Sequence, residues 1–273
     1  MKGEIMPKTA LVVDNDFFFV EFLGELLEKR GYVVIKAYDG KEGISKIQNE
    51  KIDLMFADIV MPKIDGPGLI GFVRTKYPEN CFPIVAVSGT IVEHLGSLDK
   101  IGADHYIAKG PMEKMAVSVN EFMDRIDADS FSVTDKESIT ESGTLFPRRE
   151  AVDLLDSLHF QKSILECLGV GVITLDSDTR ILGVNKAVLR ICNRTTSELL
   201  NRLITDIFPH DDKPVLINAL KGIVHNQQLD NTVFTTITDS GKTRVIVTLL
   251  LVEDKKVGWI LALEEYEKWE KQA

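Results

Sequence analysis

Short apolar runs alternate with amphipathic stretches over residues 8–127. The runs are rich in β-branched residues, which is typical of buried strands in a parallel sheet. In order, they are ALVV, YVVIKA, IDLMFA, FPIVAVS and DHYIA. The stretches between them carry apolar residues at helical spacing, with Asp39 as the N-cap of one helix and Gly31 as the C-cap of another. Five successive strand–helix units predict an α/β domain whose five-stranded parallel sheet has helices on both faces.

The pattern stops at residues 128–150. This segment, ADSFSVTDKESITESGTLFPRRE, is rich in Ser, Thr and acidic residues and has no sustained periodicity, so we expect a linker. In a predicted helix from about Arg148 to Leu168, residues then recur at spacings of four, three, four and three: Leu154, Leu158, Gln161, Leu165 and Leu168. This spacing suits either a short coiled coil or a helix that flanks its own domain, and two heptads do not decide between them.

Residues 151–267 have the pattern of an α+β domain with an N-terminal helix and an antiparallel sheet. Two strands, GVGVITLD and RILGVN, precede two short helices and one longer helix, and three more strands follow. Thr195 and Glu198 form a capping box at the start of one short helix. Turns between the last three strands are expected at 239–241 and 254–256.

Composition narrows the functional classes. The chain has 273 residues, which suggests about two domains. Its formal net charge of −10 argues against a broad basic face for nucleic acid. Its three cysteines are widely spaced, so neither a disulfide framework nor a zinc site is indicated. Because no apolar run reaches the ~20 residues of a membrane span, we expect a cytoplasmic protein without a membrane partner.

The predicted strands of the first half lead into polar residues. Asp14 and Asn15 follow the first strand, Asp58 ends the third, Ser88 ends the fourth and Lys109 follows the fifth. Ligands of an open parallel sheet bind beyond the carboxyl ends of its strands, so these side chains are expected to converge. Clustered carboxylates repel each other unless a cation compensates, and oxygen ligands suit Mg²⁺. With a lysine and a hydroxyl group nearby, Asp58 could hold a phosphoryl group.

The motifs LVVDND, FADIVMPKIDG, AVSGT and HYIAKG occur in an order and spacing that resemble a response-regulator receiver domain of two-component signalling. The resemblance covers about residues 8–127 and implies a flavodoxin-like (βα)5 fold. It implies that Asp58 accepts a phosphoryl group from a histidine kinase or phosphotransfer protein and that Mg²⁺ is required. It assigns Asp14, Asn15 and Asp58 to the metal, and Ser88 and Lys109 to the phosphate.

Ser88 and Tyr106 would form the switch of such a domain, although Tyr106 could also be an ordinary surface residue of its strand. Two departures from the family pattern bear on the site. Asn15 replaces a second acid, which should lower Mg²⁺ affinity unless Asp16 helps, and Asp16 is better placed to cap the first helix. The proline after Lys109 comes one residue late, at Pro111, so the loop geometry could differ. Core and helix packing is expected for four aromatic residues: Phe17, Phe18, Phe19 and Phe22.

Residues from about 158 to 267 resemble a PAS domain, on the run ILECLGVGVITLDSDTRILGVNKAVLRICNRTTSELLNRLITDIF. Such domains dimerise, bind small molecules or relay signals. The Cys-Asn-Arg run at 192–194 lacks the order of a flavin-reactive helix, and His210 and His225 are expected in solvent rather than on a haem. Trp259 alternates with apolar residues and is expected in the core. We therefore expect no cofactor in this domain.

Together these features predict a response regulator, not an enzyme beyond its own phosphorylation and dephosphorylation. Its output would be PAS-mediated interaction or a homodimer through the PAS domain and flanking helix. The change in packing caused by phosphorylation would pass through the face around residues 90–126 and the helix near 150–168. The alternative is a PAS-based small-molecule or redox sensor with a docking-only or poorly phosphorylated receiver. A constitutive scaffold with a silent receiver is a third possibility.

Overall fold

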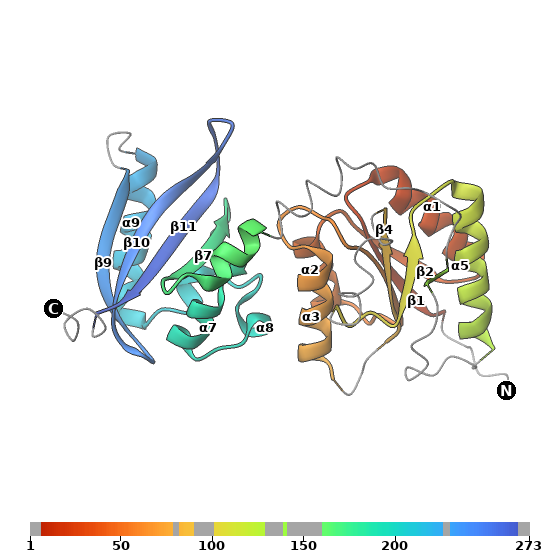
Figure 1. Cartoon of the computed structure of the whole chain (residues 1–273), viewed down its shortest axis with the longest axis horizontal. Coiled ribbons are helices and arrows are strands. Elements are labelled where there is room, and N and C mark those ends of the chain that lie inside the picture. The colour runs from red at the N-terminus through yellow and green to blue at the C-terminus, as the bar shows by residue number, and fades with distance from the viewer. Residues whose placement is uncertain are drawn as a thin grey trace. The chain divides into compact units, whose positions relative to one another are not determined.

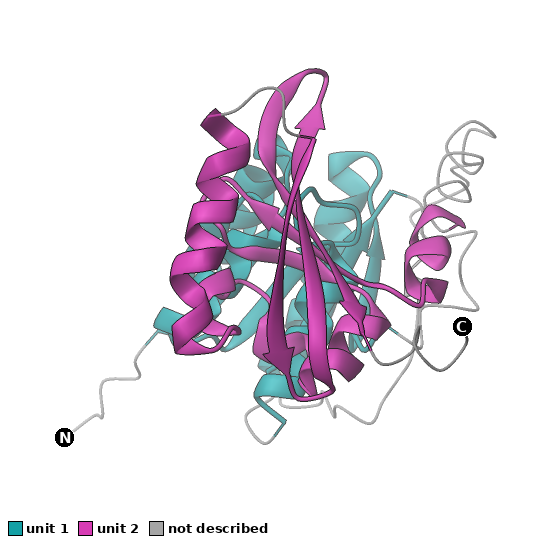
Figure 2. Cartoon of the chain, turned by 90° about the vertical axis from the view of Figure 1, so that its left-hand side faces the viewer, with its two compact units in different colours: residues 1–155 teal, residues 156–273 magenta. Residues whose placement is uncertain are grey.

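The computed structural model describes residues 7–78, 82–89, 101–128, 139–140, 160–225 and 230–266. The chain divides into two compact units, Met1–Leu155 and Asp156–Ala273 (Figure 2). The junction between the units lies outside the described residues. The domain boundaries expected from the sequence, at 127 and 151, therefore stay predictions, as does most of the linker at 128–150.

A parallel sheet forms the centre of the first unit, as predicted (Figure 1). Its five main strands run in the order β2-β1-β3-β4-β5, and every neighbouring pair is parallel. Their bounds are Thr9–Val13 for β1, Val33–Ala37 for β2, Leu54–Asp58 for β3, Ile84–Ser88 for β4 and His105–Ala108 for β5. A sixth strand of two residues, β6 (Ile139–Thr140), pairs parallel with β5. This short strand comes from the segment expected to lack regular structure.

Helices cover both faces of this sheet (Figure 1). Their bounds are Phe17–Glu28 for α1, Gly40–Asn49 for α2, Gly66–Lys76 for α3 and Met112–Asp127 for α5. Asp16, Asp39 and Asp65 cap the first three of these helices, since each carboxylate accepts a backbone N–H of the first turn. The expected caps at Asp16 and Asp39 are thus confirmed. Residues 90–100, part of the face expected to carry the signal, lie outside the described residues.

The strand side chains alternate between the two helical layers. One core cluster joins Ala10 and Val12 of β1 to Val20 of α1 and Met115 of α5. The expectation that all four phenylalanines of α1 serve packing is wrong for two of them. Phe17 is 56% exposed and Phe18 is 72% exposed. Phe19 and Phe22 do pack against the core cluster, because they lie on the face of α1 that meets the sheet.

The second unit is an α+β domain with an antiparallel sheet, as predicted (Figure 1). Its strands run in the order β8-β7-β11-β10-β9. Their bounds are Gly171–Asp176 for β7, Ile181–Val184 for β8, Asn231–Thr238 for β9, Gly241–Val252 for β10 and Lys255–Glu265 for β11. The helices are α7 (Lys186–Cys192), α8 (Thr196–Leu199) and α9 (Lys213–His225), with short 3-10 turns η2 (Ile204–Asp206) and η3 (His210–Asp212).

Most of the local features that the sequence predicts for this unit are confirmed. Thr195 and Glu198 form the capping box of α8. Trp259 packs against the core and its indole N–H donates to the Leu220 carbonyl at 3.3 Å. The turn expected at 254–256 is misplaced by one residue, because Glu253 and Asp254 form a two-residue turn in which both have positive φ.

The helix expected near 148–168 is described only over residues 160–167. Phe160 on this helix is 68% exposed, and Ile164 and Leu165 are each 47% exposed. The part that would decide between a coiled coil and a flanking helix lies outside the described residues. In the described ranges, no helix combines the length and the apolarity needed to cross a bilayer.

Candidate functional site

The carboxyl ends of three strands and the start of a loop bring four polar side chains to one edge of the first sheet. Asp14 follows Val13 of β1, whose register partner in β3 is Ala57, so Asp14 and Asp58 are adjacent in register. Ser88 ends β4, and Lys109 follows directly after β5. Asp14, Asp58 and Ser88 are all buried. The predicted convergence at this edge therefore agrees with the strand register.

The Lys109 ammonium joins the two carboxylates. Its Nζ lies 2.6 Å from Asp14 Oδ2 and 3.2 Å from Asp58 Oδ1. The Lys109 backbone N–H donates to the Ser88 carbonyl at 2.8 Å, which fixes the start of the loop. The same Nζ lies 4.7 Å from the centroid of the Phe19 ring. One cation is thus shared by two buried anions and one aromatic ring.

Backbone geometry holds both carboxylates in place. Asp14 Oδ1 accepts the Asp16 backbone N–H at 2.9 Å, so the carboxylate is tied to the residue that caps α1. Beyond Asp58, the loop comes back against its own strand at Gly66. A Cβ atom at Gly66 would lie only 2.2 Å from the Asp58 carbonyl oxygen, so only glycine fits there. This close approach explains why glycine follows Asp65 in the FADIVMPKIDG motif.

Burial dominates the electrostatics of Asp58. The pKa of Asp58 is raised to about 6, because burial and the Asp14 charge, which raise it, outweigh Lys109, which lowers it. Two carboxylates and one ammonium leave a net negative charge in a buried site. Such a charge is a recognised functional signal, and a second cation would relieve it.

The donor set fits a magnesium ion. Asp14 and Asp58 supply carboxylate oxygens, and Asn15 lies exposed next to Asp14 with an amide oxygen. Asp16 is committed to helix capping, because its Oδ1 accepts the Phe18 N–H at 2.9 Å. No group of three or more His, Cys, Asp or Glu suited to a metal occurs in the described residues. An ion that keeps several waters, as Mg²⁺ does, needs few protein ligands.

The remaining predicted positions are placed as follows. Tyr106 is partly buried on β5, where it pairs in register with Ala86 on one side and Ile139 of β6 on the other. Pro111 lies just before α5 and occupies its N-cap position. Sequence reasoning assigned Phe19 to packing alone and missed its contact with Lys109. The available signal was its position, three residues after the cap at the edge where the strands end.

The second unit has a half-open cavity of about 250 Å³. It is lined by Cys192 and Arg194 from one side and by Ile237 and Leu263 from the sheet. Burial raises the pKa of Cys192 to about 11, so the thiol is protonated and unreactive as a nucleophile at neutral pH. The two histidines weighed as haem ligands, at 210 and 225, are exposed and do not line the cavity.

Comparison with known proteins supports two family assignments. Residues 10–119 match the model of the response regulator receiver domain, and residues 160–264 match that of the PAS fold. The chain is 37% identical over 105 residues to the alkaline phosphatase synthesis transcriptional regulatory protein PhoP of Bacillus subtilis, which is 38% of this chain and 43% of that protein. It is 34% identical over 118 residues to response regulator GtcR of Aneurinibacillus migulanus, covering 41% and 46% of the two chains. The chain thus spans less than half the length of these relatives.

Solved structures of response regulators also match part of the chain. The chemotaxis response regulator CheY4 of Vibrio cholerae is 23% identical with a TM-score of 0.39, covering 42% of this chain and 98% of that one. Response regulator TrrA of Thermotoga maritima, solved with Mg(2+)-BeF, is 28% identical with a TM-score of 0.37, covering 44% and 97% of the two chains.

Proposed function

Because the chain carries a response regulator receiver domain followed by a PAS domain, we propose that it is a two-component response regulator phosphorylated on Asp58. The donor is a histidine kinase or a phosphotransfer protein. One observation carries the proposal: the Lys109 ammonium lies between the buried carboxylates of Asp14 and Asp58, at 2.6 and 3.2 Å. An isolated structural ion pair would need one carboxylate, whereas a second buried acid next to the first is unfavourable without a further role.

In the proposed reaction, an Asp58 carboxylate oxygen attacks the donor phosphorus. A P–O bond forms to Asp58, the bond from phosphorus to the donor nitrogen or oxygen breaks, and the leaving group takes up a proton. The Lys109 ammonium donates to the phosphoryl oxygens, because it already lies beside Asp58. The Ser88 hydroxyl group, at the end of the neighbouring strand, offers a further donor.

Asp14 and Asp58 would hold the magnesium ion, with the amide oxygen of Asn15 next to them. When bound, the ion supplies positive charge to the incoming phosphoryl group. Because Asn15 carries no charge, the site should bind Mg²⁺ more weakly than one with three acids. Beyond turnover of its own phosphoryl group, the protein catalyses no reaction in this proposal.

The output is a change in association through the PAS domain and the helix before it. Support comes from the exposed apolar side chains of that helix, Phe160, Ile164 and Leu165. Phosphorylation would shift Ser88 and Tyr106 and so alter the face formed by β5 and α5. In this proposal the protein works in the cytoplasm as a homodimer and binds no nucleic acid.

Phosphoryl labelling tests the first part of the proposal. The full chain is incubated with labelled acetyl phosphate, with and without Mg²⁺, and the stability of the bound label in acid and in alkali is compared. We expect alkali-labile label on the wild type and on Asp124→Asn, whose carboxylate lies on α5 and is 71% exposed. Asp58→Asn should take up no label. Equal labelling of Asp58→Asn and wild type would overturn the assignment of the acceptor.

Sedimentation tests the output. The association state of the full chain is measured with Mg²⁺ alone and with Mg²⁺ and beryllofluoride, which stands in for the phosphoryl group. We expect stronger association with beryllofluoride for the wild type and no change for Asp58→Asn. If the wild type takes up label on Asp58 but its association does not change with beryllofluoride, the result would favour a receiver that serves docking, with the PAS domain as a sensor.

A further inference from the structure

The Phe19 ring lies against the Lys109 ammonium, 4.7 Å from Nζ to the ring centroid. This distance is inside the ~6 Å range within which a cation is attracted to an aromatic face. The Lys109 side chain is 16% exposed, so water screens the contact only partly. The family pattern concerns the residues at the strand ends, and it assigns Phe19 no role beyond packing.

The start of α1 explains why this ring and no neighbouring one meets the lysine. Asp14 accepts the Asp16 N–H, and Asp16 caps the helix that begins at Phe17. Phe17 stacks on Tyr38 at 6.1 Å, with 15° between the ring planes, and so faces another strand end. The following residue, Phe18, is 72% exposed. Phe19 is therefore the ring of this run that turns toward Lys109.

The neutral ring suits this place for an electrostatic reason. Lys109 already faces two carboxylates, and a third acid would add negative charge beside Asp58. An aromatic face attracts the ammonium without adding a full charge. It can therefore hold the nitrogen close to Asp58 while the carboxylate remains able to accept a charged phosphoryl group.

We propose that Phe19 is a positioning residue for Lys109, which holds the ammonium beside Asp58 and thereby speeds phosphoryl transfer to that carboxylate. The inference rests on the proposed function, because the reaction it affects is the labelling of Asp58. The contact itself does not depend on phosphorylation, so the two can be tested separately. Phe22, one turn further along α1, packs against the same core cluster and provides a matched control.

A nuclear magnetic resonance measurement tests the contact. Protons near an aromatic face shift upfield, so the Cε methylene of Lys109 should resonate upfield of that of the exposed Lys29. The signal is assigned by its loss in Lys109→Arg. Phe19→Leu and Phe19→Met should abolish the upfield shift, and Phe22→Leu should leave it in place. An unshifted Lys109 in the wild type, or a shift that survives both Phe19 variants, would overturn the inference.

Labelling kinetics test the consequence. The loss of a cation–π contact of modest strength corresponds to a rate about two- to fivefold lower in Phe19→Leu and Phe19→Met. Phe19→Tyr, which keeps a ring, should restore the rate to within about twofold of the wild type. Phe22→Leu should also label at the wild-type rate. Equal slowing by Phe22→Leu would mean that packing alone is responsible and would overturn the positioning role.

The outcomes separate the two proposals. Normal labelling of Asp58 in every Phe19 variant would overturn the positioning role and leave the proposed function intact. A wild type that takes up no label would overturn the proposed function and the kinetic role of Phe19 together. In that case the upfield shift would still report whether the ring contacts the ammonium.

Discussion

The Lys109 ammonium is closer to Asp14 than to Asp58, at 2.6 against 3.2 Å. Asp58, the proposed phosphoryl acceptor, therefore has the longer of the two ion pairs. Within the described residues, Lys109 is the only cation that pairs with both carboxylates. The pKa of Asp58 is accordingly raised to about 6, because burial outweighs the Lys109 charge. A carboxylate that is buried and incompletely neutralised gains most from a second cation, which is the condition under which magnesium would bind.

Replacement of Lys109 by Met should destabilise the first unit by about 2–4 kcal/mol near neutral pH, because two buried carboxylates lose their cation. The loss should be smaller near pH 4.5, where Asp58 is largely protonated. Both tryptophans, Trp259 and Trp269, belong to the second unit, so their fluorescence does not report on the first. Amide hydrogen exchange in β3 is therefore the appropriate measurement.

The double variant Lys109→Met with Asp58→Asn is the control for that prediction. It removes one of the two uncompensated charges and should recover part of the lost protection in β3. If the double variant is as unstable as Lys109→Met, the cost would come from lost packing of the lysine side chain rather than from charge.

Asp58→Asn should stabilise the metal-free protein at high pH. The pKa of Asp58 is raised from 3.8 to about 6, so the unfolded state ionises first as the pH rises. The free energy of unfolding of the wild type should therefore fall by about 3 kcal/mol between about pH 4 and pH 7, at ~1.4 kcal/mol per pKa unit. Asparagine has no such titration. The stability advantage of the variant should grow over this range and stay constant above it.

This pH dependence is measured by hydrogen exchange or urea unfolding of the first unit in the presence of a chelator. A stability difference between variant and wild type that is the same near pH 4.5 and near pH 8 would show that Asp58 titrates normally. Added Mg²⁺ should reduce the difference, because the ion favours the ionised carboxylate of the wild type.

Strand ends were the most predictable part of the site. Parallel strands placed side by side have their carboxyl ends at one edge, so the positions of Asp14, Asp58 and Lys109 follow from the order of the strands. The αL turn at Glu253–Asp254 was harder, since glutamate is not a usual choice for positive φ and Asp254 is followed by lysine rather than glycine. Strand pairing across β10 and β11, and not the local sequence, determines where that turn lies.

Side-chain contacts across elements could not be predicted from the sequence. Three consecutive phenylalanines have the same local propensity, yet one stacks on Tyr38, one is exposed and Phe19 meets Lys109. The difference depends on how α1 packs on the sheet and on the loop after β5. Likewise, the two residues of β6 become a strand only because the edge of β5 is available to them.

Arg30 joins the end of α1 to α5, and its loss should destabilise the first unit. Its guanidinium donates to Asn120 Oδ1 at 3.0 Å and pairs with Asp124 at 2.7 Å and Asp127 at 3.3 Å. Its side chain is 21% exposed, so these charge-assisted bonds are partly shielded from water. Arg30→Ala should cost about 1–2 kcal/mol in the free energy of unfolding, as followed by hydrogen exchange in α1.

The neighbouring Lys29 is the matched control. Its ammonium lies 4.0 Å from Glu25, and both side chains are at least 70% exposed. Lys29→Ala should therefore change stability by no more than about 0.5 kcal/mol. Similar losses in the two variants would show that the contact with α5 does not determine the effect of Arg30.

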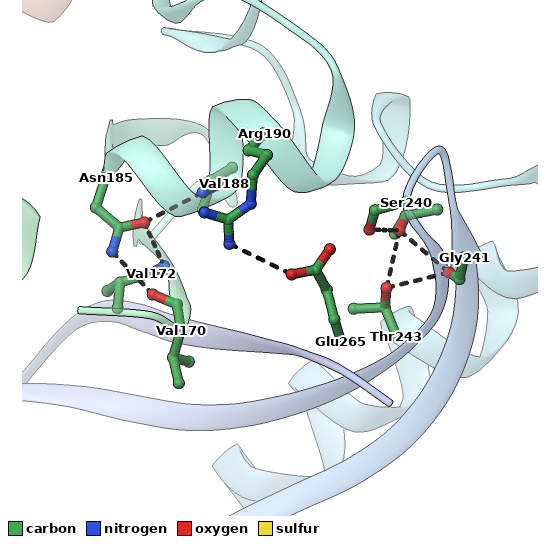
Figure 3. Close-up of polar contacts among 10 residues, drawn as sticks. Val170, Val172, Asn185, Val188, Arg190, Ser240, Gly241, Thr243 and Glu265 are labelled. Atoms are coloured by element: carbon green, nitrogen blue, oxygen red, sulfur yellow. Dashed lines mark hydrogen bonds and ion pairs between the residues drawn. The ribbon is translucent and has the colours of Figure 1, made fainter. Parts of the chain in front are cut away.

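In the second unit, no other type of N-cap residue should be able to replace Asn185 without loss of stability. Its buried side chain accepts the backbone N–H groups of Val172 and Val188, at 2.9 and 3.3 Å, and donates to the Val170 carbonyl at 2.9 Å (Figure 3). It also donates to the Leu165 carbonyl at 2.8 Å. It thus caps α7 and also holds the end of the helix at 160–167. Aspartate would keep the two accepted bonds but place a charge against two carbonyl oxygens.

We therefore expect Asn185→Asp to destabilise the second unit by about 2–3 kcal/mol, as much as Asn185→Ala, although aspartate is an equally good N-cap at an exposed helix start. Trp259 fluorescence during urea unfolding measures this loss. Asn185→Asp should also weaken protection of the helix at 160–167 against hydrogen exchange. If aspartate is tolerated while alanine is not, the cap alone matters, and the bonds to Leu165 and Val170 contribute little to stability.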